Sequence, residues 1–206
     1  MIRWKGNTIE KDFIYTVNKA AYSEIKVKGS LFIGSLFPAE SREEAETTLI
    51  EIRKKYYDAT HNCFAYIITP DDFRYSDDGE PSGTAGRPIW QVLGKFQLER
   101  VLCVVTRYFG GTKLGTGGLI RAYSQSAEET IARAEVVKKL LPVTLQLKYN
   151  FSLISKIHHL ASGFNAQITD DADASGMISK VQILPSRKND FLEKVIQETA
   201  GKVQII

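Results

Sequence analysis

A glycine-rich turn over residues 107–121, with the sequence RYFGGTKLGTGGLIR, has the residue types of an anion-binding site. Its five glycines leave backbone N–H groups uncovered where a helix is expected to begin, and these amides lie at the positive end of the helix dipole. No Asp or Glu occurs from 101 to 127, whereas Arg107, Lys113 and Arg121 are cationic. We therefore expect this turn to bind a negatively charged group such as phosphate.

The candidate anion- or nucleic-acid-binding residues come from this turn and from the start of the expected helix before it. They are Arg87, Arg107, Tyr108, Gly110, Gly111, Lys113, Gly115, Thr116, Gly117, Gly118 and Arg121. The turn is not a P-loop, because Thr116 follows Gly115 where Lys is required, and it is not a dinucleotide fingerprint, because Ile120 replaces the third glycine. The alternative is that the glycines only form a tight strand-to-helix turn. Tyr108 or Phe109 could stack on a base or fill the core at the strand end.

A second motif, DDGEPSGTAGRP over residues 77–88, combines carboxylates and hydroxyls in a loop. Its oxygens suit a hard metal ion, but the spacing places Arg74 at a ligand position of a calcium loop. Ser82 lacks the glycine that precedes a nucleophile elbow. We favour a turn-rich connection in which Asp side chains accept from local backbone and Thr84 caps the next helix. The candidate groove-lining residues are His61, Asp78, Glu80, Ser82 and Thr84.

The histidines predict neither catalysis nor a metal site. His158 and His159 are adjacent on an expected helix and point about 100° apart, so they cannot chelate a metal as an i,i+4 pair would. His61 has no nucleophile near it in the sequence that it could activate. We expect no catalytic residue, no metal and no cofactor.

The chain has 206 residues, of which 43% are hydrophobic, and a formal net charge of +3. This composition is typical of a globular protein, and anion binding must come from local patches. The first seven residues contain no apolar signal core, and no run reaches membrane-spanning length. Cys63 and Cys103 lie in apolar runs, which favours buried free thiols. We expect a cytoplasmic protein without a membrane partner.

The apolar patterns predict an α+β chain with two domains, 1–138 and 142–206. In the first domain they predict strands over 21–28, 31–37, 62–69 and 100–107, helices after Ser41 and over 86–96 and 116–134, and an acidic loop over 71–80. A helix is expected to end near residues 138–142, where Pro142 prevents its continuation. The second domain has the order β-α-β-β-α-β, with strands over 143–149, 164–169, 177–184 and 202–206 and helices over 152–162 and 187–199. This order is the ferredoxin-like pattern.

The two motifs together resemble the signature of the IMPACT family, and the segment HNCFAY from His61 also fits. The resemblance covers roughly residues 15–135. It implies an N-terminal domain similar to domain 2 of ribosomal protein S5, with a mixed sheet and two helices. It also implies a second, ferredoxin-like domain similar to the C-terminal domain of the ribosomal translocase elongation factor (elongation factor G).

Three functions remain open at this stage. The resemblance implies association with the translation apparatus, and the favoured hypothesis is a non-enzymatic translation-associated protein that binds RNA or the ribosome through the glycine-rich turn. A second hypothesis is an enzyme or sensor for a small phosphorylated metabolite, with Asp77, Asp78 or Glu80 holding Mg²⁺; it predicts a cavity joining the two motifs. A third is a regulator that binds a translation factor or another regulatory protein through exposed helix faces.

Overall fold

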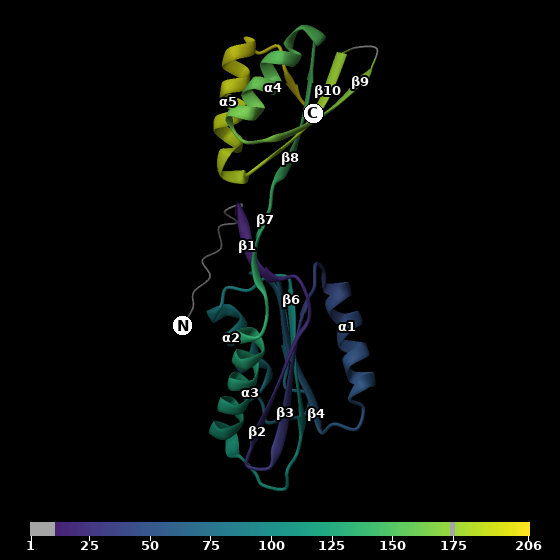
Figure 1. The fold of residues 1–206 in the computed structure, drawn as a ribbon, viewed down its shortest axis with the longest axis vertical. Helices are drawn as coiled ribbons and strands as arrows, with labels where there is room; N and C mark the ends of the chain where they lie inside the picture. Colours follow the sequence, from purple (N-terminus) through teal and green to yellow (C-terminus); the bar gives the residue numbers. More distant parts are fainter. Residues whose placement is uncertain (1–10, 174–175) are drawn as a thin grey trace. The chain divides into compact units, whose positions relative to one another are not determined.

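The computed structural model describes residues 11–173 and 176–206. Residues 1–10 of the expected first domain lie outside the described residues. The described chain forms two compact units, Ile14–Lys139 and Leu140–Ile206, with residues 11–13 belonging to the second (Figure 1). Both units combine helices with antiparallel sheet, which confirms the α+β class.

The first unit is built on one five-stranded sheet. Its strands, in spatial order, are β2 (Ala21–Val27), β3 (Ser30–Pro38), β6 (Val101–Tyr108), β4 (His61–Thr69) and β5 (Asp72–Ser76). Every neighbouring pair is antiparallel, so the mixed sheet implied by the resemblance is wrong. The acidic loop expected over 71–80 is also wrong in its first half, because β5 pairs there with β4. Phe73 and Tyr75 alternate with the polar residues of β5 and let it form an edge strand.

Three helices cover this sheet, where the resemblance implied two. The helix α1 (Arg42–Lys55) lies on one face, and α2 (Gly86–Lys95) and α3 (Gly115–Ala132) lie on the other (Figure 1). Ser41 begins α1 as expected: its hydroxyl accepts from the Glu44 amide at 3.3 Å, and the Glu44 carboxylate accepts from the backbone N–H of Glu40 at 2.8 Å. The two bonds resemble a capping box, except that Glu44 accepts from the N–H of Glu40 and not from that of Ser41, and they fix the start of the helix.

Helices on both faces bury the central strands completely. In β6, Val101, Cys103 and Val105 pack toward α2 and α3, whereas Leu102 and Val104 pack toward α1. A strand buried on both faces needs a continuous apolar run, and this is the pattern of β4 and β6. The two expected free thiols are confirmed as buried.

The second unit has the expected ferredoxin-like order of elements. Its elements are β8 (Val143–Tyr149), the 3₁₀ turn η1 (Phe151–Leu153), α4 (Ile154–Gly163), β9 (Gln167–Asp173), β10 (Gly176–Ile183), α5 (Pro185–Thr199) and β11 (Gln204–Ile205). The sheet order is β11-β8-β10-β9, with antiparallel pairs throughout. The strand expected over 164–169 begins later, because the chain turns at Asn165 with a positive φ of 53° before β9.

The segment expected to end a helix near 138–142 is a strand instead. The helix α3 ends at Ala132, and β7 (Val136–Leu140) pairs with β1 (Phe13–Val17) in a two-stranded sheet. Neither strand was predicted. The run VVKKL of β7 is mostly exposed, so it lacks the apolar alternation that marks a half-buried strand.

Candidate functional site

The two sequence motifs line a single cavity of about 370 Å³ at the end of β6. The acidic motif contributes two residues, and the glycine-rich turn with the start of α3 contributes the rest. The lining residues are Glu80, Pro81, Arg107, Phe109, Lys113, Leu114, Gly115, Thr116 and Leu119. A cavity joining the motifs is what a small-ligand site requires, and its size lies at the lower end of the ~300–1,000 Å³ typical of such sites.

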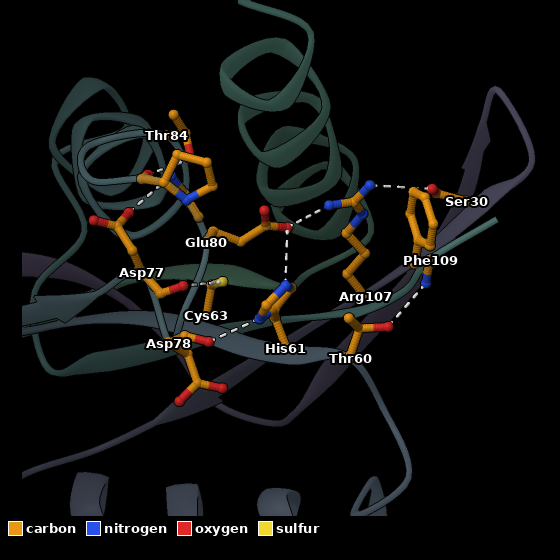
Figure 2. Close-up of polar contacts among 12 residues, drawn as sticks. Ser30, Thr60, His61, Cys63, Asp77, Asp78, Glu80, Thr84, Arg107 and Phe109 are labelled. Atoms are coloured by element: carbon orange, nitrogen blue, oxygen red, sulfur yellow. Dashed lines mark hydrogen bonds and ion pairs between the residues drawn. The ribbon is translucent and has the colours of Figure 1, made fainter. Parts of the chain in front are cut away.

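Arg107 is a buried ion-pair partner and not a surface cation. It lies in β6 at the same alternation as Val105, so its side chain points to the face covered by α2 and α3. Its Nη1 donates to Glu80 Oε1 at 2.6 Å and its Nη2 donates to Ser30 Oγ at 3.3 Å (Figure 2). The side chains of Arg107 and Glu80 are 6% and 3% exposed. The ion pair with Glu80 therefore removes Arg107 from the cations that the sequence had assigned to an anionic ligand.

The Glu80 carboxylate is the centre of a buried polar network. Its Oε1 also accepts from the Tyr123 hydroxyl at 2.7 Å, and that hydroxyl accepts from Cys63 Sγ at 3.3 Å. Burial raises the pKa of Tyr123 and of Cys63 far above their ordinary values, so both remain protonated at neutral pH and donate. His61 Nε2 lies 3.9 Å from the same Oε1.

The acidic motif is held by its own aspartates. Asp77 Oδ1 accepts from the amides of Ala85 and Gly86 at 2.9 and 2.8 Å, and its Oδ2 accepts from the Gly83 amide at 2.8 Å. Asp77 therefore caps α2, as expected for the Asp side chains of this loop. Thr84 does not: the capping position is Ala85, and the Thr84 hydroxyl donates to the Pro81 carbonyl oxygen at 2.6 Å.

Asp78 fixes the loop to β4 and to α1. Its Oδ2 accepts from the Asn62 amide at 2.7 Å, and its Oδ1 accepts from Arg53 at 2.8 Å. Its carbonyl oxygen lies 2.8 Å from His61 Nδ1 (Figure 2). His61 is thus oriented by backbone beside Glu80. Ser82 is exposed on the loop, and neither Asp78 nor Ser82 is among the cavity-lining residues.

The first part of the glycine-rich turn packs against the turn between β2 and β3. The Gly110 amide donates to Ser30 Oγ at 3.1 Å, and the Phe109 amide donates to Thr60 Oγ1 at 3.0 Å. A Cβ at Gly110 would lie 1.9 Å from the carbonyl carbon of Gly29, so only glycine fits there. These amides are satisfied internally and are not available to a ligand.

The start of α3 is different, because its amides have no side-chain cap. The N-cap position is occupied by Leu114, whose side chain cannot accept a hydrogen bond from the first amides, and the first turn contains no acidic residue. Gly115 reaches this start with a φ of +71°, and the space where a Cβ would lie is open. The Arg121 guanidinium lies over this turn, with Nη1 3.6 Å from where a Cβ of Gly117 would be. Lys113 is exposed and lines the cavity.

Arg87 and Tyr108 are held on α2 and at the end of β6. Arg87 is exposed in the first turn of α2, whose start Asp77 already caps. The Tyr108 hydroxyl donates to Asp58 at 2.8 Å, which holds the ring beside the α1–β4 loop. Of the proposed anion-binding residues, Arg107, Lys113, Gly115 and Thr116 line the cavity, and Arg121 lies over the first turn of α3 without lining it. The proposed residues outside the lining are Arg87, Tyr108, Gly110, Gly111, Gly117, Gly118 and Arg121.

Comparison with known proteins places this site in a family. The Impact N-terminal domain matches residues 28–131, which contain both motifs. The chain is 36% identical to the IMPACT family member YvyE of Bacillus subtilis over 93% of this chain and 89% of that protein.

The chain belongs to the IMPACT family.

Another member, YigZ of Escherichia coli, is 30% identical over 88% of this chain and 91% of that protein. A crystal structure of a hypothetical protein superposes with a TM-score of 0.67 and 26% identity, over 95% of this chain and 97% of that one.

In this IMPACT family member, several site residues escaped the sequence-based prediction. They are Ser30, Thr60, Pro81, Leu114, Leu119 and Tyr123. A signal for one buried network was present: Arg107 continues the alternation of Val101, Cys103 and Val105, which indicates a buried cation that needs a carboxylate partner. Within residues 11–173 and 176–206, no cluster of His, Cys, Asp and Glu could hold a metal, and no helix is long and apolar enough to cross a bilayer.

Proposed function

We propose that this protein binds single-stranded RNA at the cavity in front of α3 and acts in association with the translation apparatus. The observation that carries the proposal is the uncapped start of α3, which shares one cavity with Lys113 and with the half-exposed ring of Phe109. Free amides and a lysine suit a phosphate, and an exposed aromatic ring suits a base. A nucleotide unit presents both groups.

The aromatic ring distinguishes an RNA site from a simple anion site. Phe109 is 47% exposed, and the Arg107 guanidinium lies 5.4 Å from its ring centroid, which helps to fix the ring in place. Stacking of a base on such a ring contributes ~1–3 kcal/mol and tolerates any sequence. The family resemblance supports translation as the setting.

The test is fluorescence anisotropy with a short, unstructured RNA oligonucleotide containing all four bases. The double variant Lys113→Glu/Arg121→Glu is expected to abolish binding at physiological salt, because it reverses the charge of Lys113, which lines the cavity, and of Arg121, which lies over the first turn of α3. The control Lys26→Glu/Lys54→Glu makes the same charge change on the opposite face of the sheet, the face that α1 covers, and should bind as the wild type does.

Salt dependence provides a second readout. Loss of two phosphate contacts lowers the slope of log K against log salt concentration by roughly 1.4 for a single strand. Equal loss of binding in both double variants would show only a net-charge effect, and unchanged binding in the Lys113/Arg121 variant would place the RNA elsewhere.

A small phosphorylated metabolite remains the second candidate, because the cavity unites both motifs as that function requires. The magnesium ligands proposed for it are engaged otherwise: Asp77 caps α2, and Asp78 binds Arg53 and the Asn62 amide. If the ligand is a metabolite bound by its phosphate alone, the metabolite should raise the melting temperature of the protein, and RNA should leave that temperature unchanged.

A further inference from the structure

The cavity contains one hydrogen-bond acceptor that the protein itself does not use. The Glu80 side chain is only 3% exposed, and its Oε1 accepts hydrogen bonds from both Arg107 and Tyr123. Its second oxygen, Oε2, has no hydrogen-bond partner among residues 11–173 and 176–206, and carries no dashed line in Figure 2. That oxygen is not sealed inside the protein, so a ligand N–H or O–H group in the cavity can reach it and donate to it.

The surroundings prevent Glu80 from turning away. Arg107 and Tyr123 hold Oε1 from two sides at 2.6 and 2.7 Å, so the carboxylate is fixed where it borders the cavity. The ionised carboxylate only accepts hydrogen bonds. The ligand must therefore present N–H or O–H groups to this wall, while its negative charge lies at the start of α3 and its ring against Phe109.

We infer that the cavity selects guanine among the nucleobases, with the N1–H and N2–H₂ groups of the base donating to Glu80. This inference rests on the proposed function and names the base that the site prefers. The same chemistry is offered by a guanine within an RNA strand and by a free guanine nucleotide. The start of α3 and Phe109 contact the phosphate and the face of the base, and neither distinguishes one base from another. Glu80, on the wall formed by the acidic motif, adds contacts to the edge of the base, which differs between bases.

The other bases fit this wall less well. Guanine places two N–H donors side by side on its Watson–Crick edge. Adenine and cytosine each place one amino group beside an unprotonated ring nitrogen, whose lone pair faces the carboxylate. Uracil has one N–H between two carbonyl oxygens. Because Oε1 already accepts from Arg107 and Tyr123, both guanine donors must converge on Oε2, which has two lone pairs. A base that offers one donor beside a lone pair or a carbonyl oxygen makes one hydrogen bond fewer there, and we expect roughly tenfold discrimination.

The experiment measures anisotropy with four uridine-rich oligonucleotides that differ only in one central base, using the full chain. In parallel, unlabelled guanosine, adenosine, cytidine and uridine monophosphates compete with the bound guanine oligonucleotide. The guanine oligonucleotide is expected to bind about tenfold more tightly than the other three, and guanosine monophosphate should be the best competitor. The wild-type ratio is the primary result and requires no variant.

Two variants separate base recognition from phosphate binding. Glu80→Gln should bring the four affinities to within about twofold, because a neutral amide replaces the carboxylate. Lys113→Glu/Arg121→Glu, measured at low salt where weak binding is still detectable, should weaken all four and preserve their ratio. A circular dichroism melt accompanies Glu80→Gln; if that variant does not fold, the wild-type ratio and the competition series still decide the question.

The outcomes separate this inference from the proposed function. Four equal wild-type affinities that Lys113→Glu/Arg121→Glu still abolishes would overturn guanine selection and leave RNA binding standing. If no oligonucleotide binds, a rise in the melting temperature of the protein with guanosine monophosphate alone among the four would support guanine selection and overturn the RNA function. No binding of either kind of probe would overturn both.

Discussion

Replacing Arg107 by methionine should destabilise the first unit strongly, because it leaves the Glu80 carboxylate buried without its cation. Arg107→Met removes the 2.6 Å contact to Glu80 Oε1 and the 3.3 Å contact to Ser30, and only Tyr123 remains as a donor to Glu80. Breaking a buried ion pair at one side costs ~3–5 kcal/mol. For a unit of this size, that loss lowers the melting temperature by roughly 10–20 °C.

The assay is urea unfolding followed by circular dichroism, with a double-mutant cycle. Glu80→Met/Arg107→Met should recover most of the loss, since two apolar side chains of similar volume leave no buried charge. Arg42→Met breaks an exposed pair with Asp72 and serves as the control; its urea midpoint should stay almost unchanged.

The buried-pair reasoning is refuted if Arg107→Met unfolds at the wild-type urea midpoint. In that case Arg107 would be free to serve as a ligand cation, as the sequence first suggested. It is equally refuted if the double variant is no more stable than Arg107→Met, because the loss would then come from packing and not from the uncompensated charge of Glu80.

Three further predictions concern the turn, the cap and the thiols. Gly110→Ala places a Cβ against the backbone of the β2–β3 turn and should cost ~1–3 kcal/mol in urea unfolding, whereas Gly94→Ala, with open space in α2, should be neutral or slightly stabilising. Asp77→Ala removes the acceptor of three amides before and at the start of α2, and it should cost ~1–2 kcal/mol in urea unfolding. A loss below about 0.5 kcal/mol would contradict its capping role. Burial raises the pKa of Cys103 to about 12, so the unfolded state loses this proton from about pH 8.5 upward while the folded state keeps it. Stability should therefore fall as the pH rises through that window, by up to ~1.4 kcal/mol per pH unit for this thiol, and the fall should be shallower in Cys103→Ala; identical pH profiles would contradict the shift.

Local patterns were sufficient to predict most of the fold. The helix start at Ser41 and Glu44, the apolar run of β6 and the β-α-β-β-α-β order all depend on neighbouring residues, and the structure bears them out. The pairing of β1 with β7 was missed because it joins segments that are far apart in the chain, and because β7 is mostly exposed and lacks apolar alternation. β5 was missed because its carboxylates indicated a loop, although its aromatic residues alternate.

The sequence predicted some of the local geometry of the two motifs but not the partners of their side chains and amides. The glycine-rich turn does end at an uncapped helix start, yet its first amides serve the fold, because Ser30 and Thr60 lie far away in the sequence and accept from them. Arg107 was interpreted as a ligand cation, since the sequence does not show that Glu80, which is 27 residues away, lies against it. Thr84 was expected to cap α2, but Asp77 takes that role from the opposite side of the loop.

The most direct test of RNA binding at the start of α3 is a titration of the ¹⁵N-labelled protein with a single-stranded RNA oligonucleotide, followed by amide chemical shifts. We expect the largest shifts at Lys113, Gly115, Thr116 and Gly117, together with small shifts across the second unit. Shifts confined to the sheet of the second unit, with the amides at the start of α3 unmoved at saturation, would contradict the account.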